Sequence, residues 1–193
     1  GGEFNCSDLF NDIFENLYQM IIEKFNQTLE NKYLYALSYL GCAATDLFDK
    51  KLENYLSFLY ERTNCFLHLQ DDDLNGYFHN SQLISDFTSS IIMLLDFYDF
   101  TDFIENLSGF VIDLMSECVS ETFNDIDSFS ELMYLFSKFT QKFPTEISEK
   151  VALLIEIISK VILIAEYIND AESQSKFLIN CSIFLKRMFE ILD

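Results

Sequence analysis

The sequence has few of the residues that build tight turns and phosphate-binding loops. Its 193 residues include only five glycines and one proline, and they include no tryptophan. Loops that cradle a phosphate or a dinucleotide need several glycines at close, fixed spacing, which five scattered glycines do not supply. This scarcity argues against a nucleotide-binding enzyme.

Basic residues are also scarce. The chain has 12 Lys and Arg against 32 Asp and Glu, so its formal net charge is -20. Phosphate backbones and anionic membrane surfaces attract positively charged proteins, and an acidic chain is repelled by both. We therefore predict no direct nucleic-acid binding, and we expect a cation, a basic protein or another copy of the chain as the partner.

Side chains that commonly carry catalysis are few and unpatterned. The two histidines, His68 and His79, do not stand in a recognisable nucleophile motif. Together with Cys65 they lack the spacing of a zinc site. Asp and Glu occur throughout the chain, so no pair stands out as an acid and base couple. We predict that the protein is not an enzyme.

Signals of cellular location point two ways. Five cysteines are an odd number, and their irregular spacing is unlike that of a small secreted disulfide scaffold. Four N-glycosylation sequons, at Asn5, Asn26, Asn106 and Asn180, instead favour secretion. Secreted and intracellular locations therefore stand as equal alternatives, and the pairing of the cysteines stays open.

Hydrophobic periodicity is helical along almost the whole chain. Apolar residues make up 50% of the sequence and recur at spacings of three and four, while the alternation typical of strands is nearly absent. The pattern predicts an all-α fold, a single globular bundle of seven to eight helices. Residues 1–4 resemble a cloning remnant, and we expect residues 5–193 to form one domain.

The most apolar segment is 151–168. Only Glu156, Lys160 and Glu166 interrupt it, and a membrane span would not carry three charges there. We therefore expect this segment to be the central, buried helix of the bundle, with no membrane span in the chain.

Three further patterns predict helix faces and ends. Ser128 with Glu131 three residues later forms a capping box that opens a helix ending near Lys142. A helix is expected to start near Ser81, after the break at residues 71–80. A helix at 7–30 carries a repeating apolar face made by Leu9, Ile13, Leu17, Ile21 and Phe25.

Residues 71–82 resemble an EF-hand calcium-binding loop. The resemblance implies Gly76 at the sharp turn and calcium ligands at Asp71, Asp73, Asn75, Tyr77 (through its carbonyl) and Gln82. Gln82 stands where the family has a bidentate glutamate, and no second loop follows at the spacing of a paired EF-hand. The alternative is an Asp-rich helix connection, because Asp, Asn and Gly are common in turns. Calcium is the one cofactor that the sequence indicates.

Negative charge is concentrated in the middle of the chain. No Lys or Arg occurs between Arg62 and Lys138, an interval with fourteen Asp and Glu residues. Asp113, Glu117 and Glu121 recur every four residues, which places like charges on one helix face. One interpretation is a solvated face that keeps a phenylalanine-rich protein soluble. The other is an interaction surface.

The sequence leads to one main functional prediction and two alternatives. We predict a non-catalytic, acidic, helical domain for protein interaction or self-assembly, acting through an electronegative surface near 71–131. Its partner is a basic protein or a second copy, and acidification favours self-association by removing carboxylate repulsion. The alternatives are a calcium-binding helical module that uses 71–82, and an acidic inhibitor that mimics nucleic acid.

Overall fold

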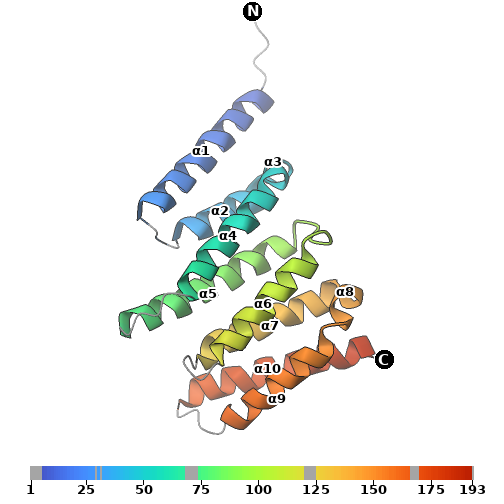
Figure 1. Ribbon diagram of the computed structural model, residues 1–193. Helices are drawn as coiled ribbons and strands as arrows, with labels where there is room; N and C mark the ends of the chain where they lie inside the picture. The colour runs from blue at the N-terminus through green and yellow to red at the C-terminus, as the bar shows by residue number, and fades with distance from the viewer. Residues whose placement is uncertain are drawn as a thin grey trace, which may run out of the picture. The chain divides into compact units, whose positions relative to one another are not determined.

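All regular structure in the described part of the chain is helical. The computed structural model describes residues 6–28, 30, 32–67, 74–119, 125–165 and 170–192. Its elements (Figure 1) are α1 (Cys6–Thr28), α2 (Lys32–Ala43), α3 (Thr45–Phe48), the 3-10 helix η1 (Asp49–Lys51), α4 (Leu52–Leu67), α5 (Leu74–Leu95), α6 (Ile104–Cys118), α7 (Ile126–Lys142), α8 (Pro144–Ser148), α9 (Val151–Ala165) and α10 (Ala171–Leu192). The predicted all-α bundle is confirmed.

The helices pack into two compact units. Unit 1 comprises residues 1–70 and 89–98, and unit 2 comprises residues 71–88 and 99–193, so α5 begins in unit 2 and ends in unit 1. The single all-helical domain expected over 5–193 stays a prediction, since two compact units can unfold together or separately.

A cluster of aromatic rings forms the core of unit 1. Phe48 is fully buried, and its ring centroid lies 6.2 Å from that of Tyr18, 5.4 Å from Tyr55 and 5.9 Å from Tyr98. The Tyr98 hydroxyl donates to the Gly41 carbonyl over 2.6 Å. This bond joins α2 to the turn that follows α5. Burial raises the pKa of both Tyr55 and Tyr98 to about 12, so both stay protonated donors at neutral pH.

Helix α1 presents a different face to this core from the one we expected. Of the five residues in the predicted apolar face, Ile21 and Phe25 are buried, whereas Leu9, Ile13 and Leu17 are exposed. Phe14 and Tyr18, one position after Ile13 and Leu17, pack inward in their place. The buried stripe of α1 consists of Phe14, Tyr18, Ile21 and Phe25.

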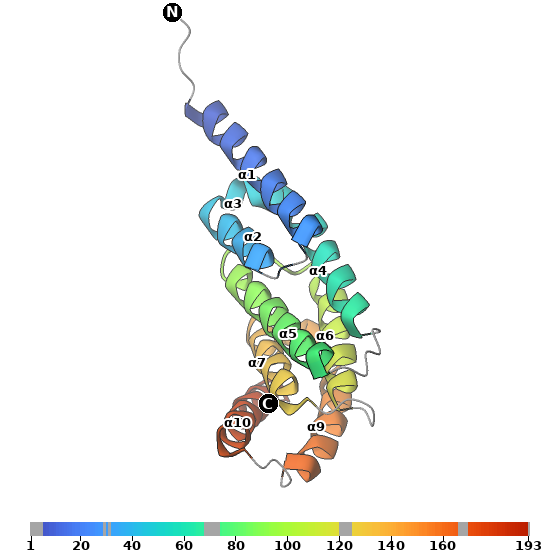
Figure 2. The same ribbon diagram turned by 90° about the vertical axis from the view of Figure 1, so that its left-hand side faces the viewer.

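The central element of unit 2 is α7, which packs against α6 and α10 (Figure 2) and against α8 (Figure 1). Ten of its seventeen residues are buried. Phe129 pairs with Phe177 of α10 at 6.3 Å between ring centroids, and Phe136 pairs with Phe184 at 6.2 Å. These ring contacts place part of the hydrophobic core of unit 2 between α7 and α10.

Small hydroxyl side chains let neighbouring helices approach α7 without leaving polar groups unpaired. Ser137 donates to the Tyr134 carbonyl over 2.7 Å, and Thr140 donates to the Ser137 carbonyl over 2.8 Å, so both hydroxyls are satisfied within the helix. The Asn180 amide of α10 donates to the carbonyl and the hydroxyl of Ser130 at 3.1 and 2.9 Å. Polar groups inside this interface are therefore hydrogen-bonded, as burial requires.

The first turn of α7 is capped by a residue other than the one predicted. Asp125 is the N-cap: its carboxylate accepts from the Ser128 backbone amide at 3.0 Å and from the Ser128 hydroxyl at 2.5 Å. The capping box of Ser128 and Glu131 is therefore wrong. A carboxylate three residues earlier takes the same backbone donor, and it gains from the positive end of the helix dipole.

Helix α9 is not the central, buried helix that its composition predicts. Only one face is buried, formed by Val151, Leu154, Ile157, Ile158 and Val161. Hydropathy reports how apolar a helix is, but not how many neighbours cover it, and α7 holds the central position instead. Within the described ranges, no helix combines the length and the apolar character needed to cross a membrane.

Two helical glycines allow a matched test of the packing in unit 1. A Cβ added at Gly41 would lie 3.0 Å from the Phe48 ring and 3.0 Å from Leu94, whereas one at Gly109 would lie 3.8 Å from its nearest neighbour, the Lys150 ammonium. Because Phe48 is enclosed by other rings, we expect Gly41→Ala to lower the free energy of unfolding by about 1–3 kcal/mol.

Gly109→Ala is the control. Alanine favours a helix over glycine by about 0.5–1 kcal/mol, and the Lys150 side chain leaves room for it, so this variant should be neutral or more stable. Denaturant unfolding of the two variants checks the difference. Equal stabilities would contradict the tight packing described around Phe48.

Candidate functional site

Exposed large apolar side chains are concentrated on three helices. In the described part of the chain, all of them except Tyr39 and Phe97 belong to α1, α9 or α10. Single exposed apolar residues are normal on a protein surface, whereas groups of them mark contact surfaces. These three helices therefore carry the candidate contact surfaces.

Helices α9 and α10 contact each other in unit 2 and expose the larger group (Figures 1 and 2). The most exposed members are Leu163 at 72% and Phe189 at 66%. We call this group the C-terminal apolar surface. It consists of Leu153, Ile155, Ile162, Leu163, Leu178, Ile179, Ile183 and Phe189.

The fold explains why these side chains remain outside. Helix α10 packs on α7 with one face, which contains the buried residues Phe177, Cys181, Phe184 and Met188. Helix α9 buries the one face described above. Both helices carry apolar residues on additional faces, and no described element covers those faces.

Charges around the C-terminal apolar surface are nearly balanced. Lys160 pairs with Glu156 at 2.8 Å on α9, and Arg187 pairs with Glu190 at 2.8 Å on α10. Lys186 lies 3.9 Å from the same Glu190 carboxylate. The α9 and α10 helices together carry a formal charge of +1, in a chain whose total is -20.

Helix α1 exposes the second group, which we call the α1 apolar stripe: Leu9, Phe10, Ile13, Leu17 and Met20. Spacings of three and four residues place it along one side of the helix, next to the buried stripe. Asp8, Asp12, Glu15 and Glu23 against Lys24 give α1 a formal charge of -3. The α1 stripe is thus apolar with acidic residues beside it.

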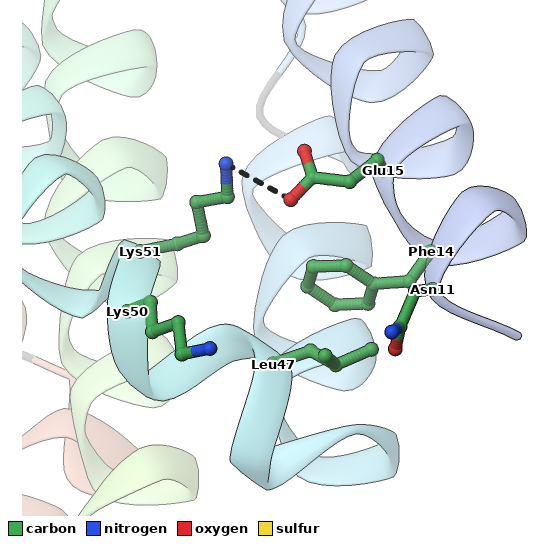
Figure 3. Close-up of a pocket in the computed structure, with 6 residues that line it drawn as sticks. All are labelled: Asn11, Phe14, Glu15, Leu47, Lys50 and Lys51. Atoms are coloured by element: carbon green, nitrogen blue, oxygen red, sulfur yellow. Dashed lines mark ion pairs between the residues drawn. The ribbon is translucent and has the colours of Figure 1, made fainter. Parts of the chain in front are cut away.

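A small pocket lies where α1 meets α3 and η1 in unit 1 (Figure 3). It is lined by Asn11, Phe14, Glu15, Leu47, Lys50 and Lys51 and has a volume of about 270 Å³. Figure 3 shows Lys51 reaching toward Glu15, which it meets at 3.1 Å, and the same ammonium lies 5.3 Å from the Tyr18 ring. This volume is below the range of about 300–1,000 Å³ typical of ligand pockets, and two of its charged side chains, Glu15 and Lys51, already pair with each other.

The acidic residues between Arg62 and Lys138 do not all lie on one uncompensated surface. Asp113 and Glu117 are exposed on α6, and among the described residues neither lies in an ion pair, whereas Glu121 lies outside the described residues. Lysines from later in the chain reach other acidic positions. Lys176 pairs with Glu131 at 2.8 Å, and Lys150 donates to the carbonyl of Glu105 at 3.2 Å.

Among the acidic residues of this interval that the structure describes, Asp86 and Asp125 are buried. Asp125 caps α7, and Asp86 accepts a hydrogen bond of 2.8 Å from Gln82. Their carboxylates stabilise local structure and are not part of an acidic surface. Asp113 and Glu117 are both exposed on α6 and lie four residues apart, so they share one face of that helix.

The predicted calcium ligands lie partly outside the described residues. Asp71 and Asp73 are among those outside, while Asn75, Tyr77 and Gln82 belong to α5, which begins at Leu74 rather than near Ser81. In an EF-hand loop these early positions curl around the ion, so binding would require the first turn of α5 to unwind. Calcium binding stays a prediction.

The described residues contain no group of three or more His, Cys, Asp and Glu side chains placed to hold a metal ion. Burial raises the pKa of the Cys42, Cys118 and Cys181 thiols, so each is protonated at neutral pH and is a poor nucleophile. Neither observation adds a catalytic candidate. The features left to explain are the exposed apolar faces and the charge.

Comparison with known proteins finds no matching family model, no matching curated protein and no matching solved structure.

The calcium hypothesis predicts a specific change in thermal stability. Calcium bound only to the folded state raises the melting temperature by mass action, and magnesium at the same ionic strength does not. Because α5 begins at Leu74, binding should also reduce the helical circular dichroism signal slightly. Thermal melts in calcium, magnesium and EDTA, with Asp71→Ala as the control, check this. Equal melting temperatures in all three would contradict the hypothesis.

Proposed function

We propose that this chain is a non-catalytic, acidic, helical domain that associates with further copies of itself through the C-terminal apolar surface. The observation that carries the proposal is the concentration of exposed apolar residues on α9 and α10. Eight large apolar side chains there are at least 36% exposed. Covering them with another protein surface removes them from water, which favours association.

The size of the surface matters because association is costly. Ordering two molecules against each other costs about 4–15 kcal/mol. Complete burial of one large apolar side chain stabilises a complex by about 1.5–3 kcal/mol, and burial of a side chain that was only half exposed contributes correspondingly less. One or two exposed residues therefore cannot drive association, whereas a surface of eight is large enough to do so.

Charge argues for a second copy at this surface. Two chains of -20 repel each other wherever their acidic surfaces meet. The α9 and α10 helices carry +1, and the whole segment 151–193 carries -2, so repulsion between two acidic chains is weaker there than over the rest of the chain. A basic partner would instead be attracted to acidic faces such as that of Asp113 and Glu117, and a nucleic-acid mimic would act through the same carboxylates.

Removing apolar side chains from α9 and α10 should abolish self-association. We expect wild-type protein to show a weight-average mass that rises with concentration in sedimentation experiments. The double variant Leu163→Ser with Phe189→Ser should stay monomeric, because it loses the two most exposed side chains of the surface. Phe97→Ser is the matched control: it also removes an exposed phenylalanine, from outside the surface, and should associate like wild type.

Salt distinguishes self-association from binding to a basic partner. Added salt screens the repulsion between two acidic chains, so self-association should strengthen as ionic strength rises. Binding driven by attraction between acidic and basic surfaces weakens under the same conditions. A wild-type mass that stays that of one chain at every concentration and salt level would contradict the proposal.

A further inference from the structure

We propose that Asn26, in the last turn of α1, is an acceptor site for an N-linked glycan, and that the fold withholds the other described sequons from this modification. The acceptor sequence Asn-X-Ser/Thr occurs at Asn5, Asn26, Asn106 and Asn180. Asn5 lies outside the described residues, so the structure compares the other three. This inference does not depend on the proposed self-association.

The sequons are more numerous than composition alone supplies. The chain has 13 asparagines and 26 serines and threonines. In random order these residues give roughly two sequons in a chain of 193 residues, and four are present. A chain meets the transferase that reads this signal only in the secretory pathway, so the excess favours secretion over the intracellular alternative.

Asn26 presents a complete acceptor at the surface. Its side chain is exposed, and so is that of Thr28, whose hydroxyl is the second group that the transferase recognises. Thr28 is the last residue of α1, and helix ends open more readily than helix interiors. The Thr28 hydroxyl donates to the Lys24 carbonyl at 3.0 Å and accepts from the Glu30 amide at 3.3 Å. Both bonds are exposed to water, which can replace them when an enzyme binds.

Asn180 is held by the fold through the atom that glycosylation uses. Its amide nitrogen donates to the carbonyl and the hydroxyl of Ser130 at 3.1 and 2.9 Å, between α10 and α7. Glycosylation replaces one of the two amide hydrogens with a sugar, so one of these hydrogen bonds is lost. The sugar would also have to fit beside a half-buried side chain in a helix contact. This sequon is therefore incompatible with the packing of α10 on α7.

Asn106 presents only one of the two groups. Its side chain is exposed in the first turn of α6, but Ser108 is fully buried. The Ser108 hydroxyl donates to the Glu105 carbonyl at 3.0 Å inside the fold. An enzyme that has to bind this hydroxyl cannot reach it in the folded chain.

The modification joins a sugar to the Asn26 side-chain nitrogen. The donor is an oligosaccharide linked through a diphosphate to a lipid, and the catalyst is an oligosaccharyltransferase. A bond forms between the Asn26 nitrogen and the anomeric carbon of the first sugar, and the bond from that carbon to the diphosphate oxygen breaks. The lipid diphosphate leaves, and the amide nitrogen gives one proton to a base of the transferase. No electrons are exchanged with an oxidant or a reductant. The glycan leaves the residues of the C-terminal apolar surface unmodified.

Glycosidase mapping of the protein isolated from the cells that make it tests the assignment. Peptide-N-glycosidase converts each glycosylated asparagine to aspartate, and in heavy-oxygen water the new carboxylate carries an isotope that mass spectrometry locates. We expect the isotope at Asn26 and its absence from Asn106 and Asn180. An unlabelled Asn26 would overturn the proposal. Label at Asn106 or Asn180 equal to that at Asn26 would overturn the selection by the fold.

Substitutions at the hydroxyl positions supply matched variants, each secreted from eukaryotic cells. Thr28→Ala should lose the glycan at Asn26, and Thr28→Ser should keep it, because serine retains the hydroxyl. Ser182→Ala is the control: it breaks the Asn180 sequon at an exposed residue, leaves the Asn180 bonds to Ser130 in place, and should keep the glycan pattern of wild type. A glycan at Asn26 that survives Thr28→Ala, or a glycan lost in Ser182→Ala, would contradict the assignment.

Discussion

Burial of α7 is the constraint on which unit 2 depends. Ten of its seventeen residues are buried, and α6, α8 and α10 all pack against it. The rings of Phe129 and Phe136 hold Phe177 and Phe184 of α10, and Asn180 adds hydrogen bonds to Ser130. These contacts fix which face of α10 turns inward. The outward faces of α10 follow from that choice, and the C-terminal apolar surface is their consequence.

The fold class was predictable from sequence, and the position of individual helices was less so. Spacings of three and four specify helices, and the inward positions of Leu52, Leu56 and Leu59 on α4 agree with their period. Position within the bundle depends on neighbours that periodicity does not name. Helix α7 looks modest in sequence because serine and threonine interrupt it, yet their hydroxyls bond to its own carbonyls and remain compatible with burial. Helix α9 looks central because it is apolar on most sides, and it is half exposed.

The candidate site was harder to predict for a related reason. An apolar residue in a helical period is ordinarily assigned to the core, so Leu9, Ile13 and Leu17 gave no sign that they stay exposed. The sequence did contain one indication of exposed apolar residues: α1 and α9 carry more apolar residues than one buried helix face can hold. The charge pattern of the sequence likewise did not predict which acidic residues are paired with basic residues in the fold. Lys176 forms an ion pair with Glu131 from forty-five residues away, so chain folding neutralises one carboxylate of the acidic interval.

Strong net charge and exposed apolar helices act against each other in this protein. The negative charge makes copies repel each other, and burial of the exposed apolar helices favours their association where the charge is small. Hydrogen exchange of wild-type protein at low and high concentration tests most directly whether α9 and α10 are where copies meet. If copies associate through the C-terminal apolar surface, the amides of α9 and α10 exchange more slowly at high protein concentration, while those of α6 around Asp113 and Glu117 do not. Unchanged exchange throughout, or protection gained at α6 alone, would contradict association through that surface.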